Sequence, residues 1–198
     1  MKNLALISLF AVAAAANANI ITNGTFEANS YPQGSYISIN SGNAASNLNG
    51  WTVEGTEVAG IGKNYLGAPS QEIDLSGSYD QSRSGIKQSF ASTAGQKYLV
   101  SFDIFTGDLY GYDSGVDFIV NGNTLGNNLK SSVSSDARKT MSYTITADSA
   151  STEVKFLRNH GLVTHVDNVN VQAVPEPMTM ITLGAGALAM LRRRRSAK

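Results

Sequence analysis

The chain has 198 residues and no cysteine, which excludes disulfide bonds, a thiolate zinc site and a cysteine nucleophile. Its 15 basic and 15 acidic residues balance overall, but residues 19–174 hold nine basic and 14 acidic residues, a net charge of −5. Nucleic acids and anionic membrane surfaces bind basic patches, so neither is an expected partner of this central region.

The N-terminal 18 residues have the pattern of a secretory signal peptide. Lys2 supplies a positive charge, residues 4–16 are apolar, and residues 16–18 (Ala-Asn-Ala) form a small-x-small cleavage site. We expect signal peptidase to cut there, which makes Asn19 the start of the exported chain. The alternative is an uncleaved N-terminal anchor, which the Ala-Asn-Ala sequence disfavours.

Residues 19–174 predict one all-β domain. Short runs of β-branched and aromatic residues alternate with turn-forming Gly, Ser and Asn, which is typical of a β-sandwich. Nine strands are expected, with a short additional one over 36–39: 20–26, 50–58, 71–75, 85–90, 97–105, 117–120, 139–147, 152–157 and 163–171. The pattern is clearest in 97–105, where alternate residues are apolar. Asn121-Gly122 predicts a hairpin turn. This number of strands, with long loops, favours a two-sheet jelly roll over a small closed barrel.

Several short motifs follow one another in a fixed order through residues 20–172. They are Asn-Gly-Thr-Phe-Glu at 23–27, Gly-Trp-Thr-Val at 50–53, Asp-Leu-Ser-Gly at 74–77, Ile-Lys-Gln-Ser-Phe at 86–90, Ala-Gly-Gln-Lys-Tyr at 94–98, Ser-Phe-Asp at 101–103 and Val-Asp-Asn-Val at 166–169. Together they resemble the galactose-binding-like jelly rolls of choice-of-anchor and DUF642-type surface proteins, which are distantly similar to several carbohydrate-binding modules. Residues 106–138 match none of these motifs.

The resemblance implies a structural calcium site made by Glu27 and Asp167. Glu27 is expected to end the first strand and Asp167 lies in the last, and these two strands can lie side by side in a jelly roll. Two carboxylates with backbone carbonyls, here those around Asn49 or Asn168, supply the oxygen ligands that Ca²⁺ takes. The alternative is that both acids only form hydrogen bonds with the backbone at the end of the sheet.

Residues 107–114 (Gly-Asp-Leu-Tyr-Gly-Tyr-Asp-Ser) combine aromatic rings with hydrogen-bond acceptors. Asp108, Tyr110, Tyr112 and Asp113 are therefore candidate ligand-binding residues, because sugars stack on flat rings and donate hydroxyl protons to carboxylates. The alternative is a solvated hairpin loop without a ligand.

No catalytic centre is predicted. Asp103 and Asp117 flank the loop, but nothing marks the fixed separation of two carboxyl groups that a glycosidase needs. The sequence has no Gly-x-Ser-x-Gly elbow, phosphate loop or dinucleotide fingerprint. His160 and His165 have no third histidine or cysteine to complete a zinc site. Trp51, which follows a turn glycine, is expected to be a core or edge residue of the sandwich and not a ligand platform. We therefore expect a protein that is not an enzyme.

The C-terminal residues have three parts in a fixed order. Pro175-Glu176-Pro177 is stiff and non-helical, residues 178–191 are apolar and uncharged, and four arginines follow: Arg192, Arg193, Arg194 and Arg195. As a helix, residues 178–191 would rise about 21 Å against roughly 30 Å of hydrocarbon, so they span a bilayer only if it thins or the arginines snorkel. The arginines should stay cytoplasmic.

This segment, 175–198, resembles the PEP-CTERM sorting signal of Gram-negative bacteria that make exopolysaccharide, including the glycines Gly184 and Gly186 in its apolar run. The resemblance implies a transient stay in the inner membrane through residues 178–191, recognition by an exosortase-type membrane protease, and delivery to the cell surface or extracellular matrix. A plain C-terminal anchor is the alternative.

The sequence thus predicts an exported surface protein whose β-sandwich binds exopolysaccharide. A structural or adhesive matrix protein without specific glycan binding is the first alternative, and a polysaccharide-active enzyme the second.

Overall fold

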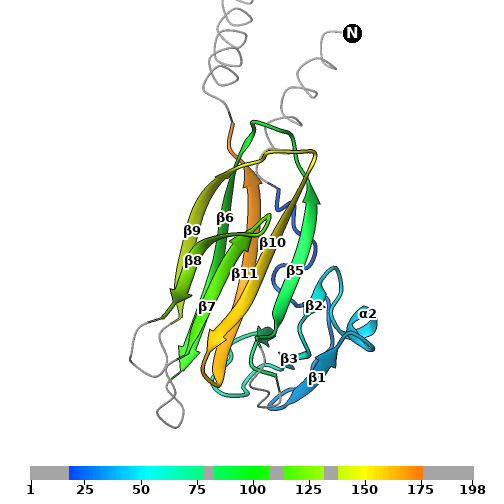
Figure 1. The fold of residues 1–198 in the computed structure, drawn as a ribbon. Helices are drawn as coiled ribbons and strands as arrows, with labels where there is room; N and C mark the ends of the chain where they lie inside the picture. The colour runs from blue at the N-terminus through cyan, green and yellow to red at the C-terminus, as the bar shows by residue number, and fades with distance from the viewer. Residues whose placement is uncertain (1–17, 78–82, 108–113, 132–137, 176–198) are drawn as a thin grey trace, which may run out of the picture.

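The computed structural model describes residues 18–77, 83–107, 114–131 and 138–175, which form a jelly-roll β-sandwich (Figure 1). The predicted fold class is confirmed. The elements are β1 (Tyr36–Asn40), α2 (Ala44–Asn47), β2 (Thr52–Glu54), β3 (Glu57–Ile61), β4 (Glu72–Asp74), β5 (Gly85–Ala91), β6 (Lys97–Gly107), β7 (Gly115–Val120), β8 (Asn123–Leu129), β9 (Lys139–Thr146), β10 (Ser151–His160) and β11 (Val163–Ala173).

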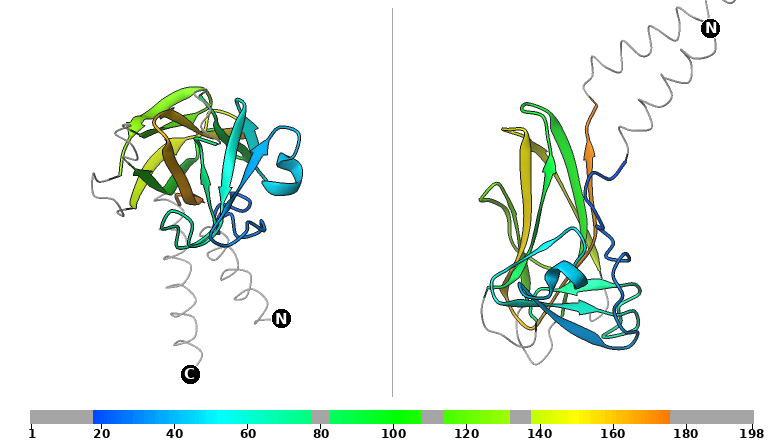
Figure 2. Two further views of the ribbon diagram at one scale, coloured as in Figure 1. Left: turned by 90° about the horizontal axis from the view of Figure 1, so that it is seen from below. Right: turned by 90° about the vertical axis from the view of Figure 1, so that its right-hand side faces the viewer.

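Two antiparallel sheets make the sandwich. Sheet A has six strands in the order β1-β3-β4-β11-β6-β9, and sheet B has five in the order β2-β5-β10-β7-β8. Figure 2 shows both layers from the edge, with β1, α2 and β3 gathered toward one end. Because every pairing is antiparallel, each strand can bury one face against the opposite sheet while the other face points away from it.

The core between the sheets is rich in aromatic rings. Phe102 of β6 lies 4.9 Å from Phe118 and 4.7 Å from Phe156, measured between ring centroids, so one ring from sheet A meets two from sheet B. The alternating burial of β6 confirms the period-two pattern predicted for it. Trp51 is 4% exposed and packs on Phe156 and Phe26, which confirms its place in the core.

The strand predicted over residues 20–26 is wrong, because these residues form turns. Side-chain amides take the hydrogen bonds that a neighbouring strand would have taken. Gln88 accepts from Thr22 N (2.8 Å) and donates to Thr22 O (3.0 Å), and the Asn19 Oδ1 atom accepts from Val171 N (2.9 Å). Phe26 adopts a φ of +57° and is fully buried, so the segment bends to insert this ring into the core instead of extending along a sheet edge.

The strand predicted over residues 50–58 is in fact two strands in different sheets. Gly55, with a φ of +80°, separates β2 of sheet B from β3 of sheet A. An added Cβ there would lie 3.0 Å from Arg83 O, so the crossing needs a glycine.

β8 was not predicted, because Asn123–Leu129 is polar and follows its partner strand directly. The Asn121-Gly122 turn before it is confirmed, with φ values of +46° and +80°.

The last strand, β11, contains a bulge that decides which of its side chains point into the core. The register with β6 shifts between Asp167 and Asn170, and Asn168 has a φ of +51°. Val166 lies in the core before the bulge and Val169 after it, so the shift exchanges odd and even positions. His165 and Asp167 both precede the bulge and alternate with Val166, so they share the face of sheet A that points away from the core.

The two ends of the described domain leave the same end of the sandwich (Figures 1 and 2). Ile20 N donates to Val171 O (2.9 Å) and Val174 N donates to Lys97 O (2.8 Å). At the other end of β11, Val163 pairs with Gly107, the last residue of β6. Ala173 and Val163 therefore mark opposite ends of the domain.

The expected signal peptide and sorting segment fall almost wholly outside the described residues. Pro175 is the last residue described, and Glu176, Pro177 and the four arginines lie beyond it. Within the described ranges, no helix is long and apolar enough to cross a membrane.

Candidate functional site

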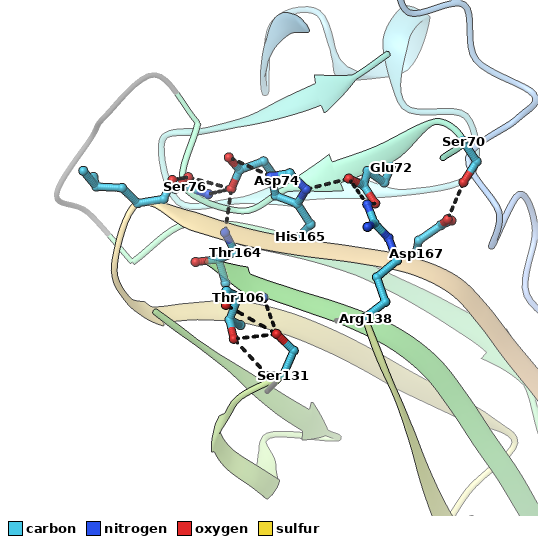
Figure 3. A network of polar contacts seen from close by, with 11 residues as sticks. Ser70, Glu72, Asp74, Ser76, Thr106, Ser131, Arg138, Thr164, His165 and Asp167 are labelled. Atoms are coloured by element: carbon cyan, nitrogen blue, oxygen red, sulfur yellow. Dashed lines mark hydrogen bonds and ion pairs between the residues drawn. The ribbon is translucent and has the colours of Figure 1, made fainter. Parts of the chain in front are cut away.

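A cluster of charged side chains lies on the outer face of sheet A, the face that points away from the core (Figure 3). Glu72 and Asp74 come from β4, His165 from β11, and Arg138 directly precedes β9. The His165 Nδ1 atom lies 2.6 Å from Glu72 Oε1, and His165 Nε2 lies 3.5 Å from Asp74 Oδ2. The side chains of His165 and Glu72 are each 1% exposed, so this is a buried ionic cluster.

Arg138 completes the charge balance of the cluster. Its Nη2 atom donates to both carboxylate oxygens of Glu72, at 2.7 and 2.6 Å. Its guanidinium carbon lies 5.1 Å from the centre of the Phe105 ring, which also meets the His165 ring edge to face at 5.4 Å. Phe105 thus supports both cations from one side.

The pKa values show that the cluster is ionised near neutral pH. Burial alone would favour the neutral form of each group, but the neighbouring opposite charges favour the charged form more strongly. The pKa of His165 is raised to about 9 because Asp74 and Glu72 face its ring, despite a burial that by itself lowers the pKa. The pKa values of Glu72 and Asp74 are lowered, again against burial, chiefly by His165. Two cations and two anions therefore neutralise one another.

Asp74 also ties the cluster to the hairpin between β10 and β11. Its Oδ1 atom accepts from Ser76 N (2.9 Å) and from Thr164 N (3.1 Å). The Ser76 hydroxyl lies 2.6 Å from the same oxygen and 2.5 Å from Leu162 O. These contacts hold the end of β4 against the beginning of β11, so the cluster organises the end of the sandwich opposite the chain ends.

Asp167 lies beside this cluster but has no paired cation among the residues that the structure describes. It accepts hydrogen bonds from Ser70 Oγ (2.9 Å) and Asn168 N (2.7 Å). Burial raises the pKa of Asp167 to about 7, and the charges of Glu72 and Asp103 add to the rise, while the two hydrogen bonds oppose it. A neutral carboxyl or a bound cation would each relieve this buried charge.

Three acids from adjacent strands form a row at this level of sheet A. Asp167 pairs in register with Asp103 of β6, and extending the β4–β11 register by one residue places Glu72 on its other side. Asp103 is compensated by Thr140 Oγ1 (2.5 Å) and Asn168 Nδ2 (2.9 Å), which both donate to it. Asp167, in the middle, is 3% exposed, so its charge is more deeply buried than that of Asp103, and it lacks the cation partners that Glu72 has.

Glu27, the other expected calcium ligand, follows the turn segment and ends no strand. Its two oxygens accept from Gln71 N (2.8 Å) and Gln71 Nε2 (3.2 Å). Asp167 accepts a hydrogen bond from Ser70, and Glu27 accepts hydrogen bonds from Gln71. The two carboxylates therefore bind consecutive residues of the segment before β4. Among the described residues, no group of three or more histidine, aspartate or glutamate side chains is arranged to hold a metal ion.

The sugar-binding candidates Asp108, Tyr110, Tyr112 and Asp113 lie outside the described residues. The residues on both sides of them are described. Asp103 lies in sheet A, whereas Asp117 lies in β7 of sheet B, where it is 1% exposed.

Sequence reasoning missed the partnership of Glu72, Asp74, Arg138 and His165. The signal was present in part, because acids at positions 72 and 74 alternate with apolar residues and so fall on one face of a strand. The partners of these acids lie 66 and more positions away in the sequence, and only the strand order brings them together.

Comparison with known proteins supports the fold. No protein-family model matches the chain, and no curated protein matches it. An arabinose-bound α-L-arabinofuranosidase has a TM-score of 0.52 at 13% identity, over 79% of this chain and 26% of the enzyme. The chain shares the fold of that part of the enzyme. It spans only about a quarter of that protein's length.

Smaller proteins give weaker matches. A CBM35 module from Paenibacillus barcinonensis has a TM-score of 0.43 at 14% identity, over 70% of this chain and 99% of the module. A CBM36 domain of a multidomain xylanase from the hindgut metagenome of Trinervitermes trinervoides has a TM-score of 0.44 at 9% identity, over 72% of this chain and 98% of the domain.

Proposed function

We propose that this chain is an exported protein of a Gram-negative cell surface or extracellular matrix, and that its β-sandwich binds exopolysaccharide. The observation that supports sugar binding is the fixed base of the segment that carries Asp108, Tyr110, Tyr112 and Asp113. Binding residues are commonly found on loops that a rigid scaffold positions.

The base of this loop is fixed on both sides. Before it, Thr106 N donates to Ser131 Oγ (3.0 Å), and Ser131 N donates to Thr106 Oγ1 (2.9 Å). After it, Ser114 is 4% exposed and its Oγ atom accepts from Val163 N (3.4 Å). The rings and carboxylates of the loop would therefore be presented from two anchored strands, and the acidic balance of the domain favours neutral sugars over polyanions.

A structural Ca²⁺ is part of the proposal. Asp167 fits a cation, because its buried carboxylate has no paired cation among the described residues and its pKa is raised to about 7. Glu27 fits less well, since Gln71 already donates to both of its oxygens. Calcium, if bound, would neutralise Asp167 and hold the 70–71 segment against β11.

We propose no catalytic role. Asp117, one of the flanking acids, accepts from Asn128 N and Asn159 Nδ2 (2.8 Å each) and forms an ion pair with Arg83. Its contacts serve the pairing of β7 with its neighbours. Asp103 lies in the other sheet, so these two acids do not face one another across a single strand pair.

Sugar binding is tested by native electrophoresis of the full-length protein, in mild detergent, through gels that contain polysaccharide isolated from the producing cells. We expect retardation of the wild type, and a roughly tenfold weaker affinity for a Tyr110→Ala/Tyr112→Ala double variant, the usual loss when interface aromatics are truncated. Leu125→Ala, on sheet B, is the matched control and should bind like the wild type. Equal mobility with and without polysaccharide would favour the structural or adhesive alternative.

Export and sorting are tested by mass. The proposal expects the surface-associated protein to begin at Asn19 and to lack the apolar run and the arginines, because signal peptidase and an exosortase-type protease remove the two ends. Intact mass spectrometry of protein released from the cell surface measures this. A mass that still includes residues 178–198 would instead support a plain membrane anchor.

A further inference from the structure

Two tyrosines, Tyr36 and Tyr65, lie together at the β1 edge of sheet A, on the face that points away from the core. Tyr36 is 39% exposed and its ring centroid lies 5.5 Å from that of half-buried Tyr65, with the planes tilted by 38°. Tyr65 packs on a small apolar cluster of Ile61, Ala59 and Ala68. The pair therefore has a supported side and a side open to solvent.

The backbone that carries the pair is tied down by hydrogen bonds. Tyr65 N donates to Gly62 O (3.1 Å), and Asn64 N donates to Ala68 O (2.7 Å). Gly62 N donates to Ser35 O (2.9 Å), which links this turn to the residue before β1. A site that is ordered before binding loses less conformational entropy when the ligand arrives.

Leu66, the residue after Tyr65, is both strained and exposed. Its φ is +47° and it is 44% exposed. A bulky side chain in the left-handed region is an outlier, and such strain collects at ligand-binding sites. Here the strained backbone holds an apolar side chain in water directly after Tyr65 in the chain, a position from which folding gains nothing.

The size of this surface indicates a small partner. Tyrosine side chains offer roughly 150–250 Å² each, and only part of that is exposed here, which falls well short of the roughly 800 Å² per partner of a stable protein interface. Lys63 and Asn64, which are exposed and directly precede Tyr65 in the chain, supply hydrogen-bond donors and an acceptor. Apolar C–H faces flanked by hydroxyl groups are the chemistry that fits this combination.

We propose that Tyr36 and Tyr65 form a contact for the sugar rings of the polysaccharide. The inference rests on the proposed function and places sugar contacts on residues other than the 108–113 loop. One sugar ring stacks on the exposed tyrosine pair, and Lys63 and Asn64 bind its hydroxyl groups.

The test compares tyrosine variants in the same native gels, which contain polysaccharide from the producing cells or soluble xylan, β-glucan, galactan or arabinan. Tyr36→Ala and Tyr65→Ala are each expected to weaken binding about tenfold, as truncation of a central aromatic does. Tyr36→Phe and Tyr65→Phe keep the rings and should retain most of the binding. Leu125→Ala, 45% exposed on β8, controls for the loss of any exposed apolar group.

Thermal unfolding of each variant shows whether it is folded, and the phenylalanine variants cover the case in which an alanine variant is not. If the wild type binds and the Tyr36→Ala/Tyr65→Ala double variant binds equally well, this inference is overturned while the proposed function stands. If the wild type binds none of the polymers, the proposed function fails, and this inference fails with it. Loss of binding in Leu125→Ala as well would also overturn the inference, because the effect would not be specific to the tyrosine pair.

Discussion

Replacing His165 with alanine is expected to lower the free energy of unfolding by about 3–5 kcal/mol at pH 7, the usual cost of removing one partner from a buried ion pair. The imidazolium lies between Glu72 and Asp74, so its loss leaves a net negative charge in a site where His165 itself is 1% exposed. Chemical denaturation measures the change. His160→Ala, at a half-exposed histidine of β10, is the matched control and should cost less than 1 kcal/mol. Equal losses in the two variants would show that the cluster contributes little.

The same cluster sets a dependence of stability on pH. His165 binds its proton more tightly in the folded chain, with a pKa of about 9, than in the unfolded chain, near 6.5. Its contribution is therefore complete below about pH 6.5 and is lost as the pH rises through 9. Glu72 and Asp74 give the opposite dependence at acidic pH, because their pKa values are lowered in the folded chain. Their contributions to stability are lost as the pH falls below the ordinary carboxylate range. In His165→Ala the loss of stability between pH 6.5 and 9 should disappear.

Replacing Asp167 with asparagine is expected to stabilise the protein by about 2–4 kcal/mol at pH 8 without calcium. The folded-state pKa of Asp167 is about 7, against about 3.8 unfolded, so its carboxyl favours folding when protonated and this contribution is lost as the pH rises from 4 through 7. A neutral amide removes that cost. At pH 4 the variant and the wild type should differ little, and urea titrations at the two pH values measure both differences. A variant that is less stable at pH 8 would contradict a buried, poorly compensated carboxylate.

Calcium should stabilise the wild type but not Asp167→Asn, and so reduce the difference in stability between them. A cation that binds only the folded state raises the unfolding temperature as its concentration rises. We expect millimolar Ca²⁺ to raise the midpoint of the wild type, and to leave Asp167→Asn unchanged. Glu27→Gln separates the two effects, because it should weaken the response to calcium without the gain in calcium-free buffer. No shift in the wild type, measured against excess EDTA, would remove the metal from the proposal.

The sequence predicted strands best where the strand carries its own pattern. In β6 the alternating apolar residues Tyr98, Val100, Phe102 and Ile104 are all buried, and the predicted range differs from the observed one only at the end. Residues 20–26 also contain β-branched and aromatic residues typical of a strand, but Gln88, 66 positions away from Thr22, supplies the hydrogen bonds in place of a neighbouring strand. The pattern of residues along a short segment cannot show that its hydrogen-bond partner is a side chain distant in the sequence.

The candidate site was harder to predict than the fold, for a related reason. Asp167 was identified because a motif contains it, but its raised pKa depends on burial and on the charges of Glu72 and Asp103, which reach it only through the strand order. His165 lacked a third histidine and was therefore not assigned to a site. Its actual partners are carboxylates and an arginine, and no spacing along the chain distinguishes such a cluster from separate surface charges.

The two ends of the described domain lie beside Ala173, so β11 separates them from the opposite end of the sandwich by its full length. β11 has 11 residues, so Val163 lies about 33 Å from Ala173, where the chain leaves the sandwich. During the transient stay in the inner membrane that the proposal includes, before the C-terminal segment is removed, the polar headgroup layer would occupy only about 5–8 Å of that height. The loop base at Gly107 and Ser114 would then face outward, where long polymers move freely, while the tethered end remained next to the lipid.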